Sequence, residues 1–377
     1  METLHAPQGS FELARYPLDK KDPLRAWDAA DEYLLQHLHE QQLPEKHQQL
    51  GILNDAFGAL GLALNRQRPW SMSDSWLSQQ GTLANLKHNG LPADQIQLLS
   101  SLQPVPGPLD LVLIKVPKSL SLLEYQLHQL RPALHEDSII MGTGMSRHIH
   151  NSTLRLFERI IGPTHTSLAR KKARLIHCHL DASASPGTSP WPKQYQLENT
   201  DFSITNHANV FSSNRLDIGS RFFLQHLPRL DAACRIIDLG CGNGVVGLMA
   251  AYINPQAELM FVDESYMAVA SARINFHAAL GQTRKAEFKV NDGLAGVAAD
   301  SADLILLNPP FHQQHAIGDA TAWRMFRQSR HCLKSAGELR IIGNRHLGYQ
   351  AKLKRLFGNC SLVASNNKFV VCSALKG

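Results

Sequence analysis

Short apolar runs that end at polar residues or glycine recur along the second half of the chain. They cover residues 234–239, 259–262 and 302–307, and a third candidate strand at 287–290, which alternates charged and apolar residues, lies between the last two. Each run has the length and the branched or leucine-rich content of a buried parallel strand. Residues 245–251, after the first run, can form a helix. Strands that alternate with helices predict an α/β fold with a mostly parallel sheet.

The first of these runs leads into a glycine-rich turn. Asp238 precedes the turn, which has glycine at three alternate positions: Gly240, Gly242 and Gly244. Such glycines permit a tight turn and leave no Cβ atoms in the way of a ligand that lies on the main chain. The turn predicts binding of S-adenosylmethionine (SAM); the alternatives are a nicotinamide or flavin dinucleotide, because residues 242–247 also match Gly-x-Gly-x-x-Gly, and a purely structural turn. The acid directly before the turn and a second motif downstream favour SAM.

Acidic residues also follow the second and third runs. Asp263 ends the second run, where a carboxylate commonly accepts two ribose hydroxyls; helix capping is the alternative. Asp292 follows the third run and is expected near the adenine amino group, although Asn-Asp-Gly is also an ordinary turn sequence. Asp217 and Gly219, in a polar segment upstream, are candidates for closing over the cofactor and the target base. Capping explains Asp217 almost as well.

The fourth run ends in the sequence Asn308-Pro309-Pro310-Phe311. An exocyclic amine on a base is a poor nucleophile because its lone pair is delocalised into the ring. The Asn308 side-chain oxygen and the Pro309 carbonyl can accept its hydrogens and return the lone pair to nitrogen, and Pro310 helps to stiffen the loop. Phe311 offers a face on which a flipped base can stack. With the glycine turn upstream, this loop predicts a SAM-dependent amino-group methyltransferase; the alternative is a rigid strand-exit turn.

Size and composition fit a two-domain protein of the cytoplasm. The chain has 377 residues, no apolar stretch of membrane-spanning length and six scattered cysteines. We therefore expect neither a membrane span nor a signal peptide. His312 and His315 follow the Asn-Pro-Pro-Phe loop, but no further ligand stands nearby, so we expect no metal. The sequence leaves the oligomeric state open, with a monomer as the simplest expectation.

Basic residues gather in two zones of a chain whose net charge is +6. No acidic residue follows Glu338. The candidate contacts for a phosphate backbone are, in the first half, Arg170, Lys171, Lys172 and Arg174, and, after Glu338, Arg345, Lys352, Lys354, Arg355 and Lys368. Solvated surface charge is the alternative for either zone alone. Beside an amine-methylating loop, the two zones together predict nucleic-acid binding.

The first half of the chain reads as a degenerate copy of the second. The turn at 54–58 stands where a glycine-rich turn is expected, yet it keeps one glycine. Three intervals in the first half resemble intervals in the second. Asp74 to Asn85 resembles Asp263 to Asn275, and Asn85 to Lys115 resembles Asn275 to Asn308. Gly162 to Lys172 resembles Gly358 to Lys368. The Pro/Ser/Gly-rich segment 181–192 is a linker. We expect a methyltransferase-like domain at 1–185, either RNA-binding or purely structural, and a catalytic domain at 186–377.

Five motifs together resemble the bacterial rRNA guanine-N2 methyltransferases of the duplicated-domain type, within that group most closely those acting on the large subunit. They are NHANVFS, LDIGSRFFLQHLP, IDLGCGNGVVGL, FVDES and NPPFHQQH. The resemblance covers nearly the whole chain. It implies two tandem Rossmann-like class I SAM-methyltransferase domains with mostly parallel seven-stranded sheets, of which only the second binds SAM. It places the cofactor at Asp238, Gly240, Gly242, Asp263 and Asp292, and the target amine at 308–311.

The activity implied by the resemblance is methylation of the 2-amino nitrogen of one guanosine in large-subunit (23S) rRNA. Four other functions stay open. They are the sister activity on small-subunit rRNA, methylation of a protein glutamine amide, methylation of a DNA amino group, and non-catalytic RNA binding. Glutamine methyltransferases usually have tyrosine after Asn-Pro-Pro, a DNA enzyme would be expected to carry a target-recognition insert, and a non-catalytic protein would be expected to show damaged motifs in both halves.

Overall fold

The chain forms two compact units, each built around its own β-sheet. The computed structural model describes residues 1–19, 22–45, 48–230, 232–310 and 315–377. Contacts divide the chain into Met1–Trp191 and Pro192–Gly377. Trp191 is buried in the first unit, where its indole Nε1 donates to Glu124 at 3.1 Å. The units therefore divide after Trp191, whereas the sequence placed the change of domain after residue 185.

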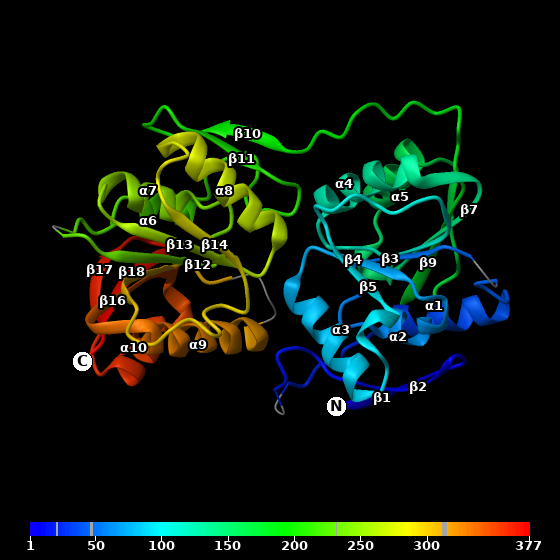
Figure 1. Cartoon of the computed structure of the whole chain (residues 1–377), viewed down its shortest axis with the longest axis horizontal. Coiled ribbons are helices and arrows are strands. Elements are labelled where there is room, and N and C mark those ends of the chain that lie inside the picture. The colour runs from blue at the N-terminus through cyan, green and yellow to red at the C-terminus, as the bar shows by residue number, and fades with distance from the viewer. Residues whose placement is uncertain (20–21, 46–47, 231, 311–314) are drawn as a thin grey trace. The chain divides into compact units, whose positions relative to one another are not determined.

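The first unit begins with a hairpin and continues as alternating helices and strands (Figure 1). Its elements are β1 (Glu2–Ala6), β2 (Gly9–Leu13), α1 (Ala29–Glu40), β3 (Leu50–Leu53), α2 (Ala59–Ala63), β4 (Trp70–Ser73), α3 (Trp76–His88), β5 (Gln97–Ser100), β6 (Leu109–Lys115), α4 (Leu120–Leu130), β7 (Leu134–Met145), α5 (Asn151–Ile160), β8 (Thr164–Thr166) and β9 (Ala173–Cys178). The sheet has the order β5-β4-β3-β6-β7-β9-β8. In this sheet β9 runs antiparallel to both of its neighbours, β7 and β8, and the other described strand pairs are parallel.

The second unit repeats this plan. Its elements are β10 (Lys193–Gln196), β11 (Ser203–Asn206), α6 (Ile218–Leu224), β12 (Arg235–Leu239), α7 (Val245–Ile253), β13 (Glu258–Asp263), α8 (Tyr266–Leu280), β14 (Ala286–Val290), β15 (Ala302–Leu307), α9 (His315–Cys332), β16 (Leu333–Asn344), α10 (Tyr349–Phe357), β17 (Ser361–Ser365) and β18 (Phe369–Leu375). The sheet order is β14-β13-β12-β15-β16-β18-β17, and β18 runs antiparallel to β16 and β17.

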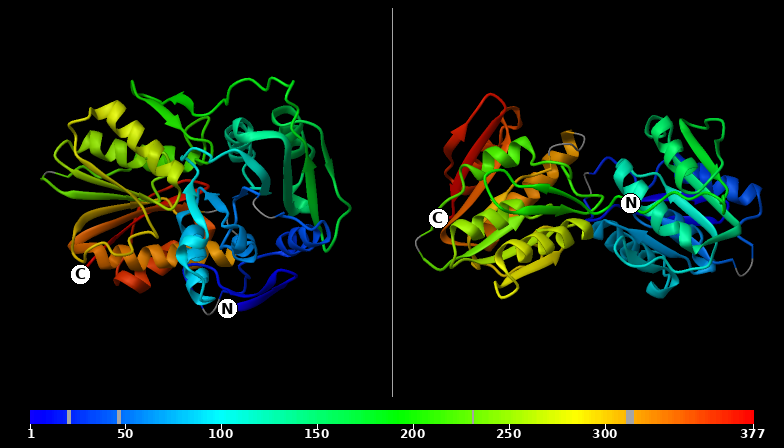
Figure 2. Two further views of the ribbon diagram at one scale, coloured as in Figure 1. Left: turned by 45° about the vertical axis from the view of Figure 1, so that its right-hand side comes forward. Right: turned by 90° about the horizontal axis from the view of Figure 1, so that it is seen from above.

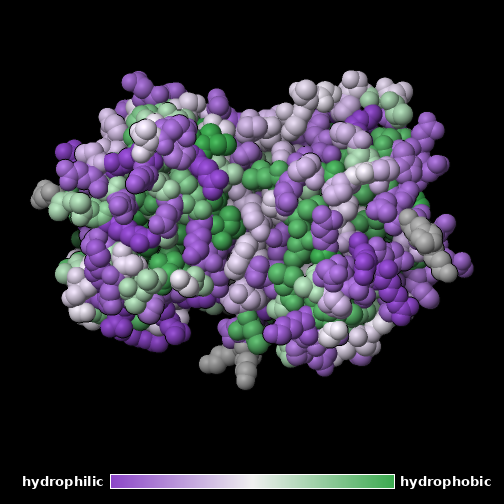
Figure 3. Space-filling model, viewed as in Figure 1, coloured by the Kyte–Doolittle hydropathy of each residue, from purple (hydrophilic) through white to green (hydrophobic). Residues whose placement is uncertain are grey.

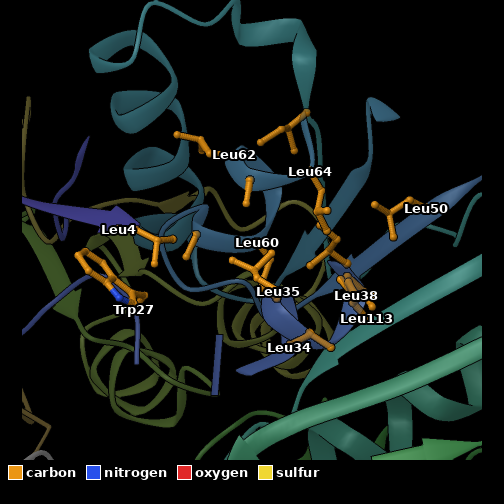
Figure 4. Close-up of a cluster of buried hydrophobic side chains, with 14 of the residues drawn as sticks. Leu4, Trp27, Leu34, Leu35, Leu38, Leu50, Leu60, Leu62, Leu64 and Leu113 are labelled. Carbon is orange, nitrogen blue, oxygen red and sulfur yellow. The ribbon is translucent and has the colours of Figure 1, made fainter. Parts of the chain in front are cut away.

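Helices cover both faces of each sheet (Figures 1 and 2). In the first unit α1, α2 and α3 pack on one face and α4 and α5 on the other; in the second, α6, α7 and α8 lie opposite α9 and α10. Figure 4 shows Leu34, Leu35 and Leu38 of α1 in one buried cluster with Leu113 of β6. Strands of a parallel sheet are apolar on both faces because both faces are covered.

The predicted fold class is confirmed, since each unit has a mostly parallel seven-stranded α/β sheet. The four candidate strands of the second half form β12, β13, β14 and β15, and the run 302–307 matches β15 at both ends. The helix predicted at 245–251 is α7, which continues to Ile253.

The surface and helix lengths add one observation about membranes. Among the described residues, no helix is both long enough and apolar enough to cross a bilayer. Hydrophilic residues make up much of the face of each unit that is visible in Figure 3.

The two sheets share a register, which identifies equivalent residues in the two units. The central pairs are Leu53 with Ile114 and Leu239 with Leu307. The residues that follow these pairs, Lys115 and Asn308, are therefore equivalent, as the spacing predicted. The predicted equivalence of Asp74 with Asp263 was wrong by one position. Ser73 is the equivalent of Asp263, because each ends its strand and pairs with the last residue of the next strand.

Candidate active site

The candidate site lies where the parallel strands of the second sheet end. The glycine turn, Asp263, Asp292 and Asn308 follow the carboxyl ends of β12, β13, β14 and β15, respectively. Because β12 pairs with both β13 and β15, these segments meet at one edge of the sheet. Ligands of open α/β sheets bind at this edge.

All three glycines of the turn adopt the left-handed backbone conformation that disfavours side chains. Their φ values are 70° at Gly240, 53° at Gly242 and 78° at Gly244. A Cβ atom at Gly244 would lie 2.7 Å from the Cβ of Ala272, so this glycine allows α8 to approach the turn. A Cβ at Gly242 would meet no atom within 4 Å. The main chain at Gly242 is thus open to a ligand.

Asp238 holds the turn against the helix that follows it. Its carboxylate is buried, and Oδ2 accepts a hydrogen bond from the Gly247 amide at 2.8 Å. Burial raises the pKa of Asp238 to about 8, and the nearby charge of Asp263 acts in the same direction. The observed contact is structural: through the Gly247 amide, Asp238 holds the turn on which a cofactor would lie.

Asp263 joins the second strand to the glycine turn. Its Oδ2 accepts from the Gly242 amide at 2.9 Å, and its Oδ1 accepts from the Ser265 amide at 3.0 Å. The cap of α8 is Ser265, whose hydroxyl accepts from the Ala268 amide, so Asp263 itself is not the N-cap residue. A carboxylate oxygen has two lone pairs, which leaves Asp263 able to accept ligand hydroxyl groups beside the open main chain.

Asp292 is fixed by α9, a contact that sequence reasoning missed. The Arg324 guanidinium lies 3.0 Å from its Oδ1, and the Gln328 amide donates to its backbone carbonyl at 3.1 Å. Burial raises the pKa of Asp292, and the charge of Arg324 opposes this shift. No motif spacing signals this pair, because the basic residue lies within a helix of mixed composition.

The nitrogen and the oxygen of the Asn308 side-chain amide have different surroundings. Its Nδ2 donates to the Ser220 hydroxyl at 3.3 Å, whereas its Oδ1 is buried and has no hydrogen-bond partner among the described residues. Pro309 is buried and Pro310 is exposed. Phe311, the predicted stacking residue, lies outside the described residues. The structure therefore leaves one buried acceptor at the end of β15.

Asp217 and Gly219 lie at the start of α6, beside this acceptor. Asp217 is the N-cap, and its Oδ2 accepts from the Ser220 amide at 3.0 Å. A Cβ at Gly219 would lie 3.2 Å from the ring of Phe369. The capping alternative for Asp217 is what the structure shows. Both residues are linked to Asn308 through Ser220, which lies in the same polar segment and whose contact with Asn308 the sequence did not reveal.

A buried amide network supports the glycine turn from behind. The Asn243 amide donates to Asn206 at 2.9 Å, and the Asn275 amide donates to the Asn243 carbonyl at 2.9 Å. Asn275 also donates to the carbonyl of Thr205 in the hairpin of β10 and β11, at 2.9 Å. The NHANVFS motif, residues 206–212, begins at Asn206. This network fixes the turn that the cofactor is expected to contact.

The basic residues of the second unit divide into two groups. Arg345 follows β16 and Lys368 precedes the antiparallel β18, so both lie at the sheet edge that holds Asn308. Lys352, Lys354 and Arg355 lie on α10, the helix that begins after this edge of the sheet and runs away from it.

The basic cluster of the first unit is exposed but partly paired. Arg170, Lys171, Lys172 and Arg174 lie just before or at the start of β9. Arg170 is 3.5 Å from Glu40, and Lys171 is 3.2 Å from Glu32. These exposed pairs weaken the local positive charge only modestly.

Metal ligands do not gather in the part of the chain that the structure describes. No group of three His, Cys, Asp or Glu side chains there is arranged to hold an ion. Of the two histidines named from sequence, His312 lies outside the described residues and His315 begins α9.

Comparisons with known proteins identify the family. The RLMG N-terminal domain model matches residues 1–182, and the methyltransferase small domain model matches residues 201–373. Ribosomal RNA large subunit methyltransferase G of Streptomyces avermitilis is 51% identical over 380 residues, covering 100% of this chain and 99% of that protein. The protein of the same name from Yersinia enterocolitica is 52% identical over 373 residues, covering 97% of this chain and 92% of that protein.

A solved structure supports the fold. The 16S rRNA N2 methyltransferase of T. thermophilus, in complex with AdoMet and guanosine, has a TM-score of 0.76 at 18% identity and covers 100% of this chain and 98% of that chain. The expected tandem methyltransferase-like domains and the predicted resemblance are confirmed, which favours SAM over a dinucleotide at the glycine turn. The chain belongs to the ribosomal RNA large subunit methyltransferase G family.

Proposed function

We propose that this chain transfers a methyl group from SAM to the exocyclic N2 of one guanosine in large-subunit (23S) rRNA. The observation that carries the proposal is the buried Asn308 Oδ1, an acceptor without a partner in the described chain. A buried acceptor left unsatisfied costs about 1–3 kcal/mol, so its retention beside an open glycine turn suits a donor that arrives with the substrate. The family membership of the whole chain supports the same reaction.

The residues around the glycine turn fit SAM. The open main chain at Gly242 accommodates a ligand without steric conflict, and Asp263 lies within hydrogen-bonding distance of that turn. We assign ribose binding to Asp263 and adenine contact to the Asp292 region, with Gly240 and Gly244 shaping the turn. SAM, when bound, supplies an electrophilic methyl group. Asp238 and the Asn243 network hold the main chain on which the cofactor lies.

The Asn-Pro-Pro loop prepares the nucleophile. The Asn308 Oδ1 and the Pro309 carbonyl accept the two amine hydrogens, which restores lone-pair density to the nitrogen. Pro310 limits the motion of these acceptors, so less entropy is lost when the amine binds. No strong general base is needed, because the proton becomes acidic once nitrogen has acquired the methyl group. Phe311 remains the expected stacking partner of the base.

Large-subunit rRNA is the proposed partner. Arg345 and Lys368 lie at the edge that holds Asn308 and, among the named basic residues of the second unit, are the best placed to contact phosphates near the target. The cluster 170–174 of the first unit and the α10 residues Lys352, Lys354 and Arg355 are assigned further contacts to the RNA backbone. The first unit then serves as an RNA-binding domain without SAM. A cytoplasmic, monomeric enzyme is part of the proposal.

Small-subunit rRNA is the second candidate substrate, because the T. thermophilus enzyme with this fold acts on 16S rRNA. Incubation with tritiated SAM and ribosomal RNA that lacks the modification, followed by nucleoside mass spectrometry, separates the two. We expect label in N2-methylguanosine from large-subunit RNA. Label confined to small-subunit RNA would reassign the substrate, and label in neither RNA, free or in assembly particles, would contradict the proposed reaction.

A further inference from the structure

Asn308 needs a fixed orientation to act as proposed. Its amide can rotate so that either Oδ1 or Nδ2 faces the incoming amine. With Nδ2 facing the amine, two donors would oppose each other and no lone pair would be restored. In the structure Nδ2 donates to Ser220 at 3.3 Å and Oδ1 is the atom left without a partner among the described residues.

Ser220 is itself held in place by the start of α6. It is the third residue after the N-cap Asp217, whose carboxylate accepts its amide hydrogen at 3.0 Å. Its side chain is largely buried, with the residue 8% exposed. Gly219 packs beneath it against Phe369, where a Cβ would approach the ring to 3.2 Å. The hydroxyl therefore has a defined position relative to the end of β15.

The first unit preserves this contact with different chemistry. Lys115 is the register equivalent of Asn308, and Asp31 is the third residue after the N-cap Asp28, as Ser220 is after its own N-cap. The Lys115 ammonium forms an ion pair with Asp31, whose side chain is fully buried. Each half of the chain thus holds a complementary donor and acceptor at the same two positions, an ammonium with a carboxylate or an amide with a hydroxyl.

We propose that Ser220 is a positioning residue, whose hydroxyl fixes the Asn308 amide with Oδ1 toward the target amine. The inference rests on the proposed function, since it assigns Asn308 as the amine acceptor. Ser220 acts through Asn308 and does not touch the substrate. In the first unit the residue at the strand end is Lys115, whose ammonium can only donate and is paired with Asp31, so this position offers no side-chain acceptor to an amine.

The test measures single-turnover methyl transfer to unmodified rRNA together with SAM affinity by calorimetry. Ser220→Ala is expected to lower the transfer rate about tenfold, the equivalent of one lost hydrogen bond of about 1.4 kcal/mol, with an unchanged SAM dissociation constant. Ser220→Thr keeps the hydroxyl and should restore most of the rate. The matched control is Ser301→Ala, which removes a hydroxyl bonded to the Ala298 carbonyl at 2.7 Å, before β15 begins.

A double-variant cycle separates positioning from a general structural effect. If Ser220 acts through Asn308, adding Ser220→Ala to Asn308→Ala causes no further loss of rate. Additive losses, or full activity of Ser220→Ala, would overturn the inference. If Ser220→Ala does not fold, Ser220→Cys, with similar volume and a weak acceptor, takes its place. An inactive wild type would overturn the proposed function itself, and the inference with it.

Discussion

Asn85 and Asn275 make the same hydrogen bonds in the two halves of the chain. Each side-chain amide donates at 2.9 Å to a carbonyl in the turn after the central strand, that of Phe57 in the first unit and of Asn243 in the second. Both side chains are buried. The shared contact shows that the two units have the same arrangement at this point, although only the second has a glycine-rich turn there.

The same two asparagines also tie each hairpin to its unit. Asn85 bonds both the amide and the carbonyl of Ala14, at 3.0 and 2.9 Å, and Asn275 bonds the same groups of Thr205, at 2.7 and 2.9 Å. Replacement of either by alanine leaves several buried backbone groups unsatisfied. We expect each replacement to destabilise its own unit by roughly 2–4 kcal/mol.

The two replacements should differ in their effect on the cofactor. Asn275→Ala frees the Asn243 carbonyl in the glycine turn and should weaken SAM binding, whereas Asn85→Ala should leave SAM affinity unchanged. Calorimetric titration of SAM, with hydrogen exchange to report the stability of each unit, checks both points. Equal losses of SAM affinity in the two variants would count against a single cofactor site in the second unit.

Local sequence patterns located the site because its parts follow strands. Apolar runs bounded by glycine or proline gave the ends of β12 and β15, and therefore the relative place of Gly242 and Asn308. The spacing between residues placed the equivalent of Asp263 at Asp74, one position too late, because spacing alone does not reveal which residue ends a strand. The strand register shows that Ser73 is the equivalent residue.

The contacts that sequence reasoning missed join residues that are far apart along the chain. Ser220 is 88 residues from Asn308 along the chain, and the two meet only because α6 and β15 pack in one unit. Arg324 reaches Asp292 from α9 in the same way. Ser220 lies in the first turn of a helix that Asp217 caps, and a serine there carries no signal of a contact to the Asn-Pro-Pro loop.

Asn308→Ala should separate chemistry from cofactor binding. The substitution removes the buried Oδ1 acceptor and leaves the glycine turn intact, so we expect turnover to fall more than tenfold with SAM affinity retained. Steady-state methyl transfer and SAM titration on the same preparation provide the check. Full turnover in this variant would remove the assigned role of the Asn-Pro-Pro loop.

Asp263→Ala should weaken SAM binding and leave the methyl-transfer step largely intact, the opposite of what we expect for Asn308→Ala. Its carboxylate bonds the Gly242 amide and lies where ribose hydroxyls are proposed to bind. We expect SAM to bind at least tenfold more weakly, with methyl transfer largely recovered at saturating SAM. The matched control in the first unit is Ser73→Ala, at the equivalent strand end, which should change neither quantity. An unchanged dissociation constant for Asp263→Ala would place the ribose contact elsewhere.

In the first unit, the ion pair at the position equivalent to Asn308 should be structural. Lys115→Met leaves Asp31 buried without its cation, which we expect to destabilise the first unit by about 3–5 kcal/mol. Adding Asp31→Leu removes the buried charge and should recover much of that loss. Urea unfolding of the three proteins, with SAM affinity as the control, tests this. A Lys115→Met variant as stable as the wild type would show that the pair contributes little.

Asp238 gives the second unit a pH dependence of known sign. Its pKa in the folded chain is about 8, raised by burial and by Asp263, against about 3.9 for an unfolded aspartate. Between these values the folded state holds a proton that the unfolded state has released. The stability from this group is therefore complete below about pH 4 and is lost as pH rises through about 8.

Asp238→Asn keeps a neutral oxygen acceptor for the Gly247 amide and cannot titrate. In the SAM-free chain, we expect the stability of the wild type relative to this variant to fall between pH 5 and pH 8 by roughly 1 kcal/mol or more, since one pKa unit corresponds to about 1.4 kcal/mol. Hydrogen exchange in urea, compared between the two proteins at each pH, isolates the second unit. A constant difference across this range would mean that Asp238 is already ionised in the folded chain, and that the Gly247 amide outweighs burial.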